Sequence, residues 1–180
     1  RVKIIAAGTS YYAGLVGAYL LESVARIPAT AELASELRYR NPIVERNTVY
    51  FAVSQSGETA DTLYAMRELQ RKGARVLGIC NVVGSTIPRE SDGGVYIHSG
   101  PEIAVASTKA FTSQLSAFYL YALMMGRMRH MGIESGLSFI EDLEAVPAAI
   151  QEVLDRRDSL VHLARKYAHA EDFLFLGRGI

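Results

Sequence analysis

Hydrophobic positions fall into short continuous runs, rich in β-branched residues, that alternate with longer amphipathic segments. Runs of this kind, closed by glycine, proline or asparagine, are typical of strands that are buried on both faces. Five strands are predicted, at residues 2–7, 29–32, 48–53, 75–80 and 95–98. The longer segments predict helices at residues 11–26, 35–39, 59–72 and 107–125, with a short helix ending at residue 90.

The alternation of strands and helices predicts a three-layer α/β fold, with helices on both faces of a five-stranded parallel sheet. In such sheets, ligands bind at the carboxyl ends of the strands, where the strand order reverses. If the order is 2-1-3-4-5, the turns after the first and third strands meet in that crevice. These turns read GTSYY, at residues 8–12, and SQSGET, at residues 54–59. Both are rich in hydroxyl groups, so the pattern and the topology indicate one place for a site.

The βα alternation ends near residue 130. Residues 1–130 are predicted to form one subdomain, and residues 131–170 a helical connection that packs on it, with Pro147 early in a second helical segment. Residues 173–176 have a strand-like pattern, so residues 171–180 are predicted to begin a second, truncated subdomain. Because the chain starts in one strand-like run and stops after another, we expect a piece of a longer polypeptide.

Composition narrows the possible functions. The chain has 180 residues, 49% of them hydrophobic, which is enough for a domain with a core. Its 19 basic and 19 acidic residues balance without forming blocks, which disfavours nucleic acid and anionic membranes as partners. The single cysteine, Cys80, excludes a disulfide framework and fits a reducing cytoplasm. The apolar stretch at residues 110–125 has a polar start, so we predict a buried or interface helix rather than a membrane span.

The hydroxyl-rich turns are suited to bind a phosphate. The start of a helix exposes unpaired N–H groups and the positive end of the helix dipole, and a phosphate accepts several hydrogen bonds there. Gly57 lets the backbone approach closely, whereas Glu58 would repel an anion and is expected to point away. A helix cap explains any one hydroxyl better, but the cluster as a whole favours anion binding. The candidate phosphate ligands are Ser10, Ser54, Gln55, Ser56 and Thr59.

Competing motifs for a cofactor or a metal are missing from the sequence. The first turn has neither the Walker spacing with its lysine nor G-x-G-x-x-G, and Ser56 is not in a G-x-S-x-G elbow. The four histidines have no metal-ligand spacing. We therefore expect no cofactor and no metal.

A third loop, GPEIAVASTKAFTSQ at residues 100–114, follows the fifth strand. Ser107 and Thr108 would lie at a helix start, and Lys109 adds a cation. A cap explains the two hydroxyls about as well as ligand contact does. The position of the loop beside the same strand ends favours a place in the pocket.

Four segments in this order resemble the isomerase part of the glucosamine-6-phosphate synthases, the glutamine–fructose-6-phosphate aminotransferases. They read GTSYYAG, RNTVYFAVSQSGETADT, ICNVVGSTIPRESD and PEIAVASTKAFTSQ, and the similarity covers most of the chain. The resemblance implies the sugar isomerase (SIS) fold and a phosphosugar ligand. It implies that Ser10, Ser54, Gln55, Ser56 and Thr59 hold the phosphate. It also implies that Thr9, the backbone of Val105, and Ser107 contact the sugar.

The same resemblance implies the reaction and the partners. The parent enzymes join a glutamine-hydrolysing domain to two SIS halves, form homodimers, and make glucosamine 6-phosphate from fructose 6-phosphate and ammonia released from glutamine. Their glutamate base, ring-opening histidine and Schiff-base lysine lie in the second half and the C-terminal tail. We therefore expect no catalytic residue in this chain, and Lys109 is not the Schiff-base lysine. The chain alone should bind fructose 6-phosphate or glucosamine 6-phosphate weakly and convert neither.

Two other functions stay open at this point. One is a regulatory SIS module that senses a phosphosugar, although the DNA-binding segment that usually accompanies such a module is not visible. The other is a stand-alone phosphosugar isomerase, which would need its base within the chain. The candidates for that base are Glu32, Glu36, Glu58 and Glu102, and nothing in the sequence singles one out.

Overall fold

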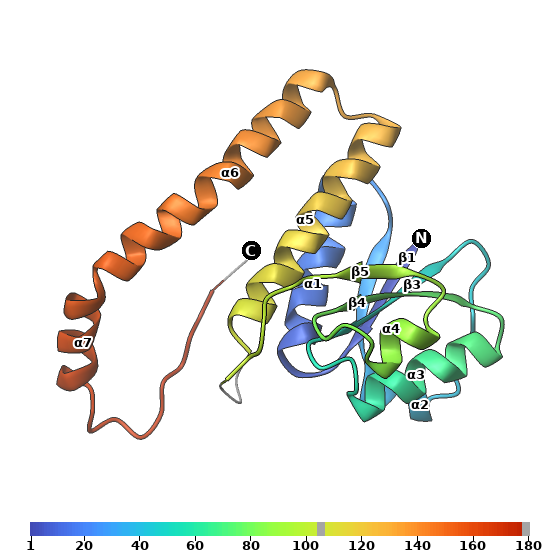
Figure 1. Ribbon diagram of the computed structural model, residues 1–180, viewed down its shortest axis with the longest axis horizontal. Coiled ribbons are helices and arrows are strands. Elements are labelled where there is room, and N and C mark those ends of the chain that lie inside the picture. Colours follow the sequence, from blue (N-terminus) through green and yellow to red (C-terminus); the bar gives the residue numbers. More distant parts are fainter. Residues whose placement is uncertain (104–106, 178–180) are drawn as a thin grey trace. The chain divides into compact units, whose positions relative to one another are not determined.

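A five-stranded sheet, parallel throughout, organises the first part of the chain (Figure 1). The computed structural model describes residues 1–103 and 107–177. The strand order is β2-β1-β3-β4-β5, which confirms the predicted fold class and order. The strands are β1 (Val2–Ala6), β2 (Ala29–Leu33), β3 (Val49–Ser54), β4 (Arg75–Cys80) and β5 (Gly94–Tyr96).

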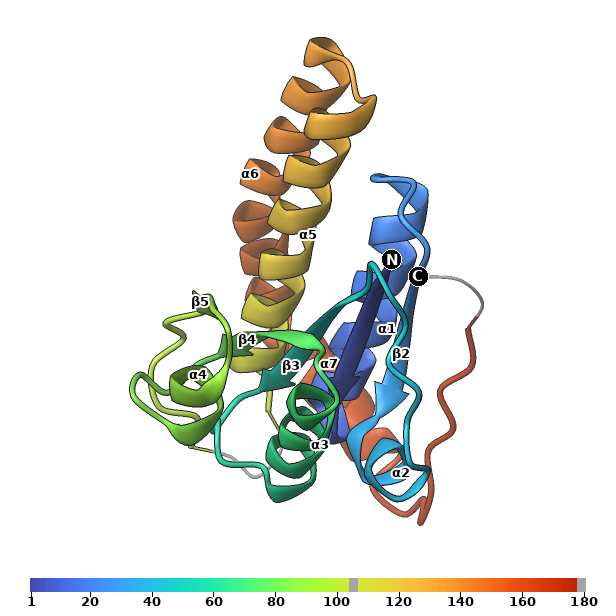
Figure 2. The same ribbon diagram turned by 90° about the vertical axis from the view of Figure 1, so that its right-hand side faces the viewer.

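Helices cover both faces of the sheet (Figure 2). Each face has its own hydrophobic core. Helices α1 (Gly8–Ser23) and α5 (Lys109–Arg129) pack on one face, against side chains such as Ile4 and Phe51. Helices α2 (Ala34–Tyr39), α3 (Ala60–Arg71) and α4 (Thr86–Glu90) cover the other face, against the alternate side chains. Because both faces are covered, the strands are apolar at successive positions, which is the pattern that predicted them.

Helices α1 and α5 approach each other closely. A Cβ atom at Gly17 would lie 2.6 Å from the Phe118 ring, so only glycine fits there. Phe118 is fully buried and meets Phe51 edge-on, with ring centroids 6.3 Å apart. This contact fixes the distance between the two helices near the site described below.

Helix α1 begins at Gly8, three residues earlier than predicted. Gly, Thr and Ser are weak helix formers, so the pattern alone placed them in a loop. Gly8 has φ +56°, which turns the chain from β1 directly into the helix. Ser10 therefore lies in the first turn of α1.

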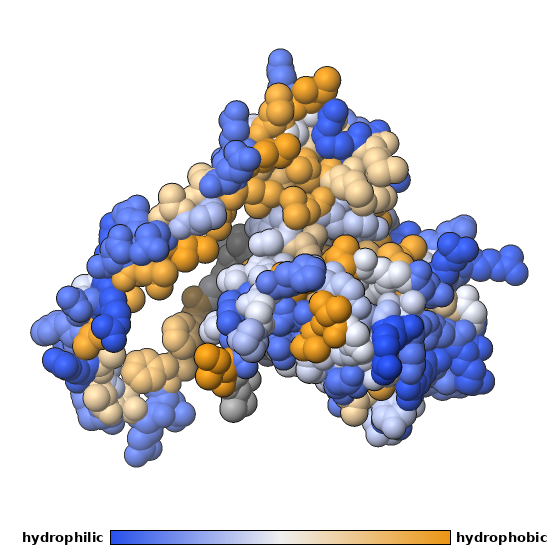
Figure 3. All heavy atoms as spheres, viewed as in Figure 1, coloured by the Kyte–Doolittle hydropathy of each residue, from blue (hydrophilic) through white to orange (hydrophobic). Residues whose placement is uncertain are grey.

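The chain divides into two compact units, Arg1–Met131 and Gly132–Ile180. The second contains α6 (Ile133–Asp155) and α7 (Arg157–Lys166). The predicted division near Pro147 is wrong, because α6 continues through this proline. A proline in a helix removes one N–H donor, and on an exposed helix water satisfies the carbonyl that is left free. Figure 3 shows hydrophobic side chains along α6. Leu137 and Ile150 of this helix are exposed.

The strand predicted at residues 173–176 is not formed. These four residues are not in regular structure, and their side chains are 63–92% exposed. A strand needs a neighbouring strand for its backbone hydrogen bonds, and the described part of the chain offers none here. That residues 171–180 begin a second subdomain stays a prediction. None of the helices described is long and apolar enough to span a membrane.

Candidate functional site

The two hydroxyl-rich turns emerge from neighbouring strands. β1 and β3 pair in parallel, with Ala6 opposite Val53. Adjacent strands lie about 4.8 Å apart, so the first turn of α1 and the loop 54–59 leave the same edge of the sheet side by side. This edge is the point where the strand order reverses, as the predicted ligand site requires.

Three hydroxyl groups converge within the loop 54–59. Ser54 Oγ lies 2.9 Å from Thr59 Oγ1, and Ser56 Oγ lies 3.4 Å from Thr59 Oγ1 and 3.5 Å from Ser54 Oγ. The backbone N–H of Gly57 donates to Ser54 Oγ at 3.0 Å, and that of Glu58 donates to Ser56 Oγ at 3.1 Å. Each serine oxygen thus already accepts a hydrogen bond, which leaves its own hydrogen to be donated.

Helix capping does not account for Thr59. It occupies the N-cap position of α3, yet its side chain makes no capping bond, and α1 also begins without one. Thr59 Oγ1 faces the two serines instead. Both helix starts therefore keep backbone N–H groups that no side chain caps, and such groups attract anions. Gln55 is half-buried, and within the described residues its side-chain amide has no hydrogen-bond partner.

The segment after β4 holds the loop 54–59 through hydrogen bonds. Asn81 N donates to Gln55 O at 3.3 Å, and Ile87 N donates to Gly57 O at 2.9 Å. Glu58 Oε1 accepts the backbone N–H of Thr86 at 2.7 Å, and these bonds to Thr86 lower the pKa of the Glu58 carboxyl group. Glu58 is thus engaged by the start of α4. The motif ICNVVGST, for which the sequence suggested no role, holds the serine loop in place.

Ser10 is joined to α5 by a buried hydrogen bond. Gln114 Nε2 donates to Ser10 Oγ at 3.0 Å, and the two side chains are 0% and 7% exposed. In the sequence, Gln114 is only part of the polar start of the helix, and this contact was not predicted. The signal in the sequence that could have indicated it is a glutamine at a position of the helix that faces the apolar core. Thr9, the neighbour of Ser10, is exposed on the first turn of α1.

Two side chains anchor the loop after β5. Asn81 donates to Gly100 O and accepts from Ser99 N, both at 2.7 Å. The Glu102 carboxylate accepts the backbone N–H groups of Thr108 (3.2 Å) and Ala110 (3.1 Å) at the start of α5.

The hydroxyl groups of Ser107 and Thr108 also donate to Glu102, at 3.4 and 3.3 Å. The hydrogen bond from Ala110 is the largest cause of the lowered pKa of Glu102. The hydrogen of the Ser107 hydroxyl is therefore used within the protein. Val105, the other predicted sugar contact of this loop, lies outside the described residues.

The four carboxylates considered as a base are poorly suited to that role. Hydrogen bonds lower the pKa of Glu58 and of Glu102, which makes both weaker bases. Glu32 pairs with Lys3 at 3.3 Å and also with Arg40, and Glu36 is exposed on α2. Within the described residues, no group of histidine, cysteine, aspartate or glutamate side chains could hold a metal.

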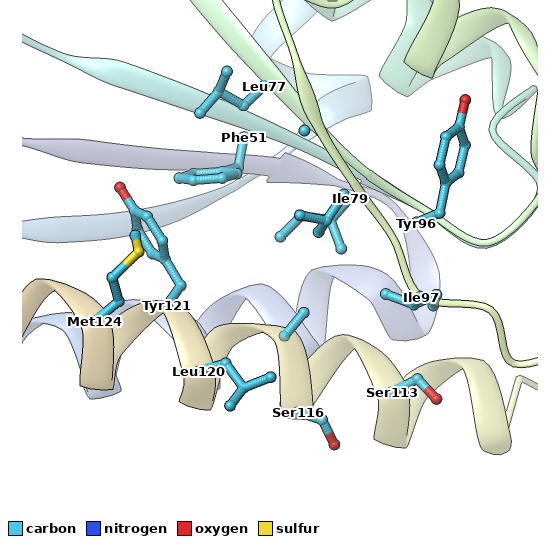
Figure 4. Close-up of a pocket in the computed structure, with 13 residues that line it drawn as sticks. Phe51, Leu77, Ile79, Tyr96, Ile97, Ser113, Ser116, Leu120, Tyr121 and Met124 are labelled. Carbon is cyan, nitrogen blue, oxygen red and sulfur yellow. The ribbon is translucent and has the colours of Figure 1, made fainter. Parts of the chain in front are cut away.

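Cys80 is a buried strand residue, as predicted. Burial raises the pKa of its thiol to about 12, which keeps it protonated and unreactive. A separate pocket of about 680 Å³ lies between the sheet and α5 (Figure 4). Apolar side chains such as Leu77, Ile79 and Leu120 line it, and none of the predicted phosphate ligands does.

The fold and the site together define a class of protein. A doubly wound parallel sheet with hydroxyl-rich turns at its switch point is a three-layer α/β protein that binds small ligands at the carboxyl ends of its strands. Residues 1–124 match the family model of the SIS domain. The chain belongs to the SIS domain family.

Several relatives are similar over the whole chain. A glutamine–fructose-6-phosphate aminotransferase (isomerizing) from Thermus thermophilus is 51% identical over 181 residues, which cover 100% of this chain and 30% of that protein. The enzyme of the same name from Streptomyces coelicolor is 51% identical over 182 residues and is covered to 29%. The chain thus spans less than a third of the length of these curated relatives.

A solved structure shares the fold closely. It is the C-terminal domain of glucosamine-fructose-6-phosphate aminotransferase from Francisella tularensis, with a TM-score of 0.95 and 36% identity. The match covers 99% of this chain and 51% of that one. The predicted SIS fold is therefore confirmed by a solved relative as well as by the family model.

Proposed function

We propose that this chain is the phosphosugar-binding part of a glutamine–fructose-6-phosphate aminotransferase, which makes glucosamine 6-phosphate from fructose 6-phosphate and glutamine. The observation that carries the proposal is the cluster of Ser54, Ser56 and Thr59, whose oxygens lie within 3.5 Å of one another at the start of α3. The names of the close relatives support it. They favour it over a regulatory module and over a stand-alone isomerase.

The phosphate group is held by hydroxyl groups, one amide and two helix starts. Hydrogen bonds to a charged group contribute about 1.5–3 kcal/mol each, so several of them give micromolar to millimolar affinity once the losses on binding are subtracted. The proposed phosphate ligands are Ser10, Ser54, Gln55, Ser56 and Thr59.

The sugar is contacted by Thr9, Val105 and Ser107. Because the Ser107 hydroxyl donates to Glu102, it would act towards a sugar hydroxyl as an acceptor. The contribution of the chain is thus to fix the position of the phosphosugar, and holding a reactant in place is itself a large part of catalysis. Ammonia addition and proton transfer belong to other parts of the longer protein.

The partners follow from the same proposal. They are a glutamine-hydrolysing domain, a second SIS half, and a second copy of the protein in a cytoplasmic homodimer. The relatives, which are about three times as long as this chain, support the first two. Sedimentation at several concentrations tests the homodimer, and a full-length protein that stays monomeric contradicts it.

Calorimetric titration of the 180-residue chain tests the binding function. Fructose 6-phosphate, glucosamine 6-phosphate and inorganic phosphate should each give a saturable signal, whereas fructose without the phosphate should give none. The absence of a signal at millimolar fructose 6-phosphate, in a sample shown to be folded, would refute the binding role. Turnover by the chain alone would contradict the assignment of the chemistry to other parts of the protein.

A further inference from the structure

Gln114 is a polar side chain held in a fully buried position. Its side chain is 0% exposed on the inner face of α5, and its amide donates to Ser10 Oγ at 3.0 Å. Its other polar atom, Oε1, is buried and has no hydrogen-bond partner among the described residues. An apolar side chain of similar size would avoid this unpaired acceptor. Stability alone therefore does not explain a glutamine here.

The packing of α1 on α5 holds this pair in register. One turn along α5 from Gln114, Phe118 fits over Gly17 of α1, where a Cβ atom would be 2.6 Å from the ring. The amide therefore has little freedom to move away from the Ser10 hydroxyl. Because the amide is held here, the Ser10 oxygen stays engaged as a hydrogen-bond acceptor.

Two other serines in helices bond back onto their own helix. Ser23 donates to Leu20 O at 3.4 Å, and Ser116 donates to Thr112 O at 3.1 Å, which is a common habit of serine in helices. Ser10 makes no such bond among the described residues, and its oxygen accepts from Gln114 instead. A hydroxyl has one hydrogen, so an oxygen engaged as an acceptor keeps that hydrogen for another partner.

We propose that Gln114 is a positioning residue that fixes the Ser10 hydroxyl as a hydrogen-bond donor to the phosphate of the ligand. The inference rests on the proposed function and deepens it. Gln114 does not touch the phosphate itself. Its amide N–H group donates to Ser10 Oγ from inside the core. The hydrogen of the Ser10 hydroxyl is then left to point towards the uncapped first turn of α1.

A double-mutant cycle on the protein at its full natural length tests this proposal. Gln114→Met keeps the size and the buried surface but cannot donate, and Ser10→Ala removes the hydroxyl. Gln114→Met should raise the Kd for inorganic phosphate and for fructose 6-phosphate about tenfold, the effect of losing one charge-assisted bond. Added to Ser10→Ala, it should change the Kd less than twofold.

Leu37→Val is the control, because Leu37 is buried in the core on the other face of the sheet and lies outside the interface between α1 and α5. It should lower the denaturation midpoint and leave the Kd for inorganic phosphate within twofold. The ³¹P chemical shift of bound phosphate adds a readout that stability does not move. Gln114→Met and Ser10→Ala should displace this shift in the same direction, and Leu37→Val should not.

The outcomes separate the inference from the proposed function. No binding of phosphate by the native protein would overturn the proposed function. Native binding with an unchanged Kd in Gln114→Met, or with equal losses in the native and Ser10→Ala backgrounds, would overturn only the role of Gln114. Gln114→Glu provides a second variant if Gln114→Met does not fold. Its ionised carboxylate accepts the Ser10 hydrogen and repels the anion, so wild-type affinity in that variant would also contradict the proposal.

Discussion

The three hydroxyl groups of the loop after β3 bond to one another and to backbone N–H groups of their own loop rather than capping a helix. Ser54 and Ser56 accept N–H groups of their own loop, and Thr59 stands at the N-cap of α3 without capping it. A hydroxyl used in this way adds little to the stability of the helix. It is available to a ligand that accepts hydrogen bonds, which gives a clear expectation for each substitution.

Thr59→Val should weaken phosphate binding with little loss of stability. Valine keeps the shape of threonine and removes only the hydroxyl, so the Kd for inorganic phosphate should rise about tenfold. Thr62→Val, in the same helix, is the control, because Thr62 Oγ1 is buried without a partner. That control should leave the Kd unchanged and should be neutral or stabilising. Calorimetry and urea unfolding measure both effects, and a loss of stability as large as the loss of affinity in Thr59→Val would support capping instead.

Glu102→Gln should weaken binding of the sugar without weakening binding of the phosphate. The Glu102 carboxylate accepts hydrogen bonds from the backbone and hydroxyl groups of the segment that carries Ser107. Replacing it should raise the Kd for fructose 6-phosphate several-fold and leave the Kd for inorganic phosphate unchanged. Titration with the two ligands measures the difference, and Glu36→Gln, an exposed change on α2, is the control. An equal loss for both ligands would place Glu102 in the support of the phosphate loop instead.

The same carboxylate should contribute to the pH dependence of stability. Its pKa in the folded chain is lowered, with the bond from Ala110 as the first cause, relative to about 4.3 in an unfolded chain. A lowered pKa stabilises the fold above the unfolded value, and that contribution is lost as the pH falls through the folded value. The difference in stability between the native chain and Glu102→Gln should therefore shrink below about pH 4. Urea unfolding from pH 3 to 7 measures it, and a difference that grows towards low pH would contradict this role.

At the scale of the elements, the site is made by loops that support one another. Gly57 belongs to the loop after β3, and a Cβ atom there would lie 1.9 Å from Ser85 Oγ of the loop after β4. The residue also has φ +66°, which disfavours a side chain. A substitution at this position acts on the contact between the two loops as well as on the backbone.

Gly57→Ala should therefore lower both stability and phosphate affinity. Gly73→Ala is the matched control, because Gly73 has φ +86° but nothing within 4 Å of the added Cβ. The control should show only the conformational cost of about 1 kcal/mol. Chemical unfolding and calorimetry of the two variants measure the difference. Equal losses of stability, with no change in Kd for Gly57→Ala, would contradict a role of this contact in the site.

The elements themselves were largely predictable from periodicity. β4 has the predicted bounds, because its apolar run ends at clear turn residues. The start of α1 was missed, because the conformation of Gly8 and the packing of Gly17 under Phe118 override weak propensity. The continuation of α6 through Pro147 was missed, since a proline marks a probable boundary and not a certain one.

The site was predictable only in part. The clusters at Ser10 and Ser54 could be found, because hydroxyl-rich turns after parallel strands are a local signal. The hydrogen bonds of Gln114 and Glu102 could not, because they depend on side-chain geometry. Gln114 meets Ser10 across 104 residues of sequence, and no local pattern encodes such a pair.

At the scale of the whole chain, the two units differ in how much they bury. The first contains both hydrophobic cores and all the described site residues. In the second, α7 has no buried residue and α6 has only Gly136. Stability should therefore be distributed unevenly between them.

A chain that ends at Met131 should fold and bind without the second unit. Its cores remain intact, so it should unfold cooperatively and bind inorganic phosphate with a Kd within twofold of that of the 180-residue chain. In hydrogen exchange on the 180-residue chain, the amides of α6 and α7 should exchange much faster than those of β1, β3 and β4, because few side chains cover them. A truncated chain that is unfolded, or equal protection of α6 and β3, would show that the second unit contributes to the stability of the first. In that case phosphate affinity measured on the shorter chain would describe a damaged site, whereas a folded and binding chain would locate the phosphate site wholly within the first unit.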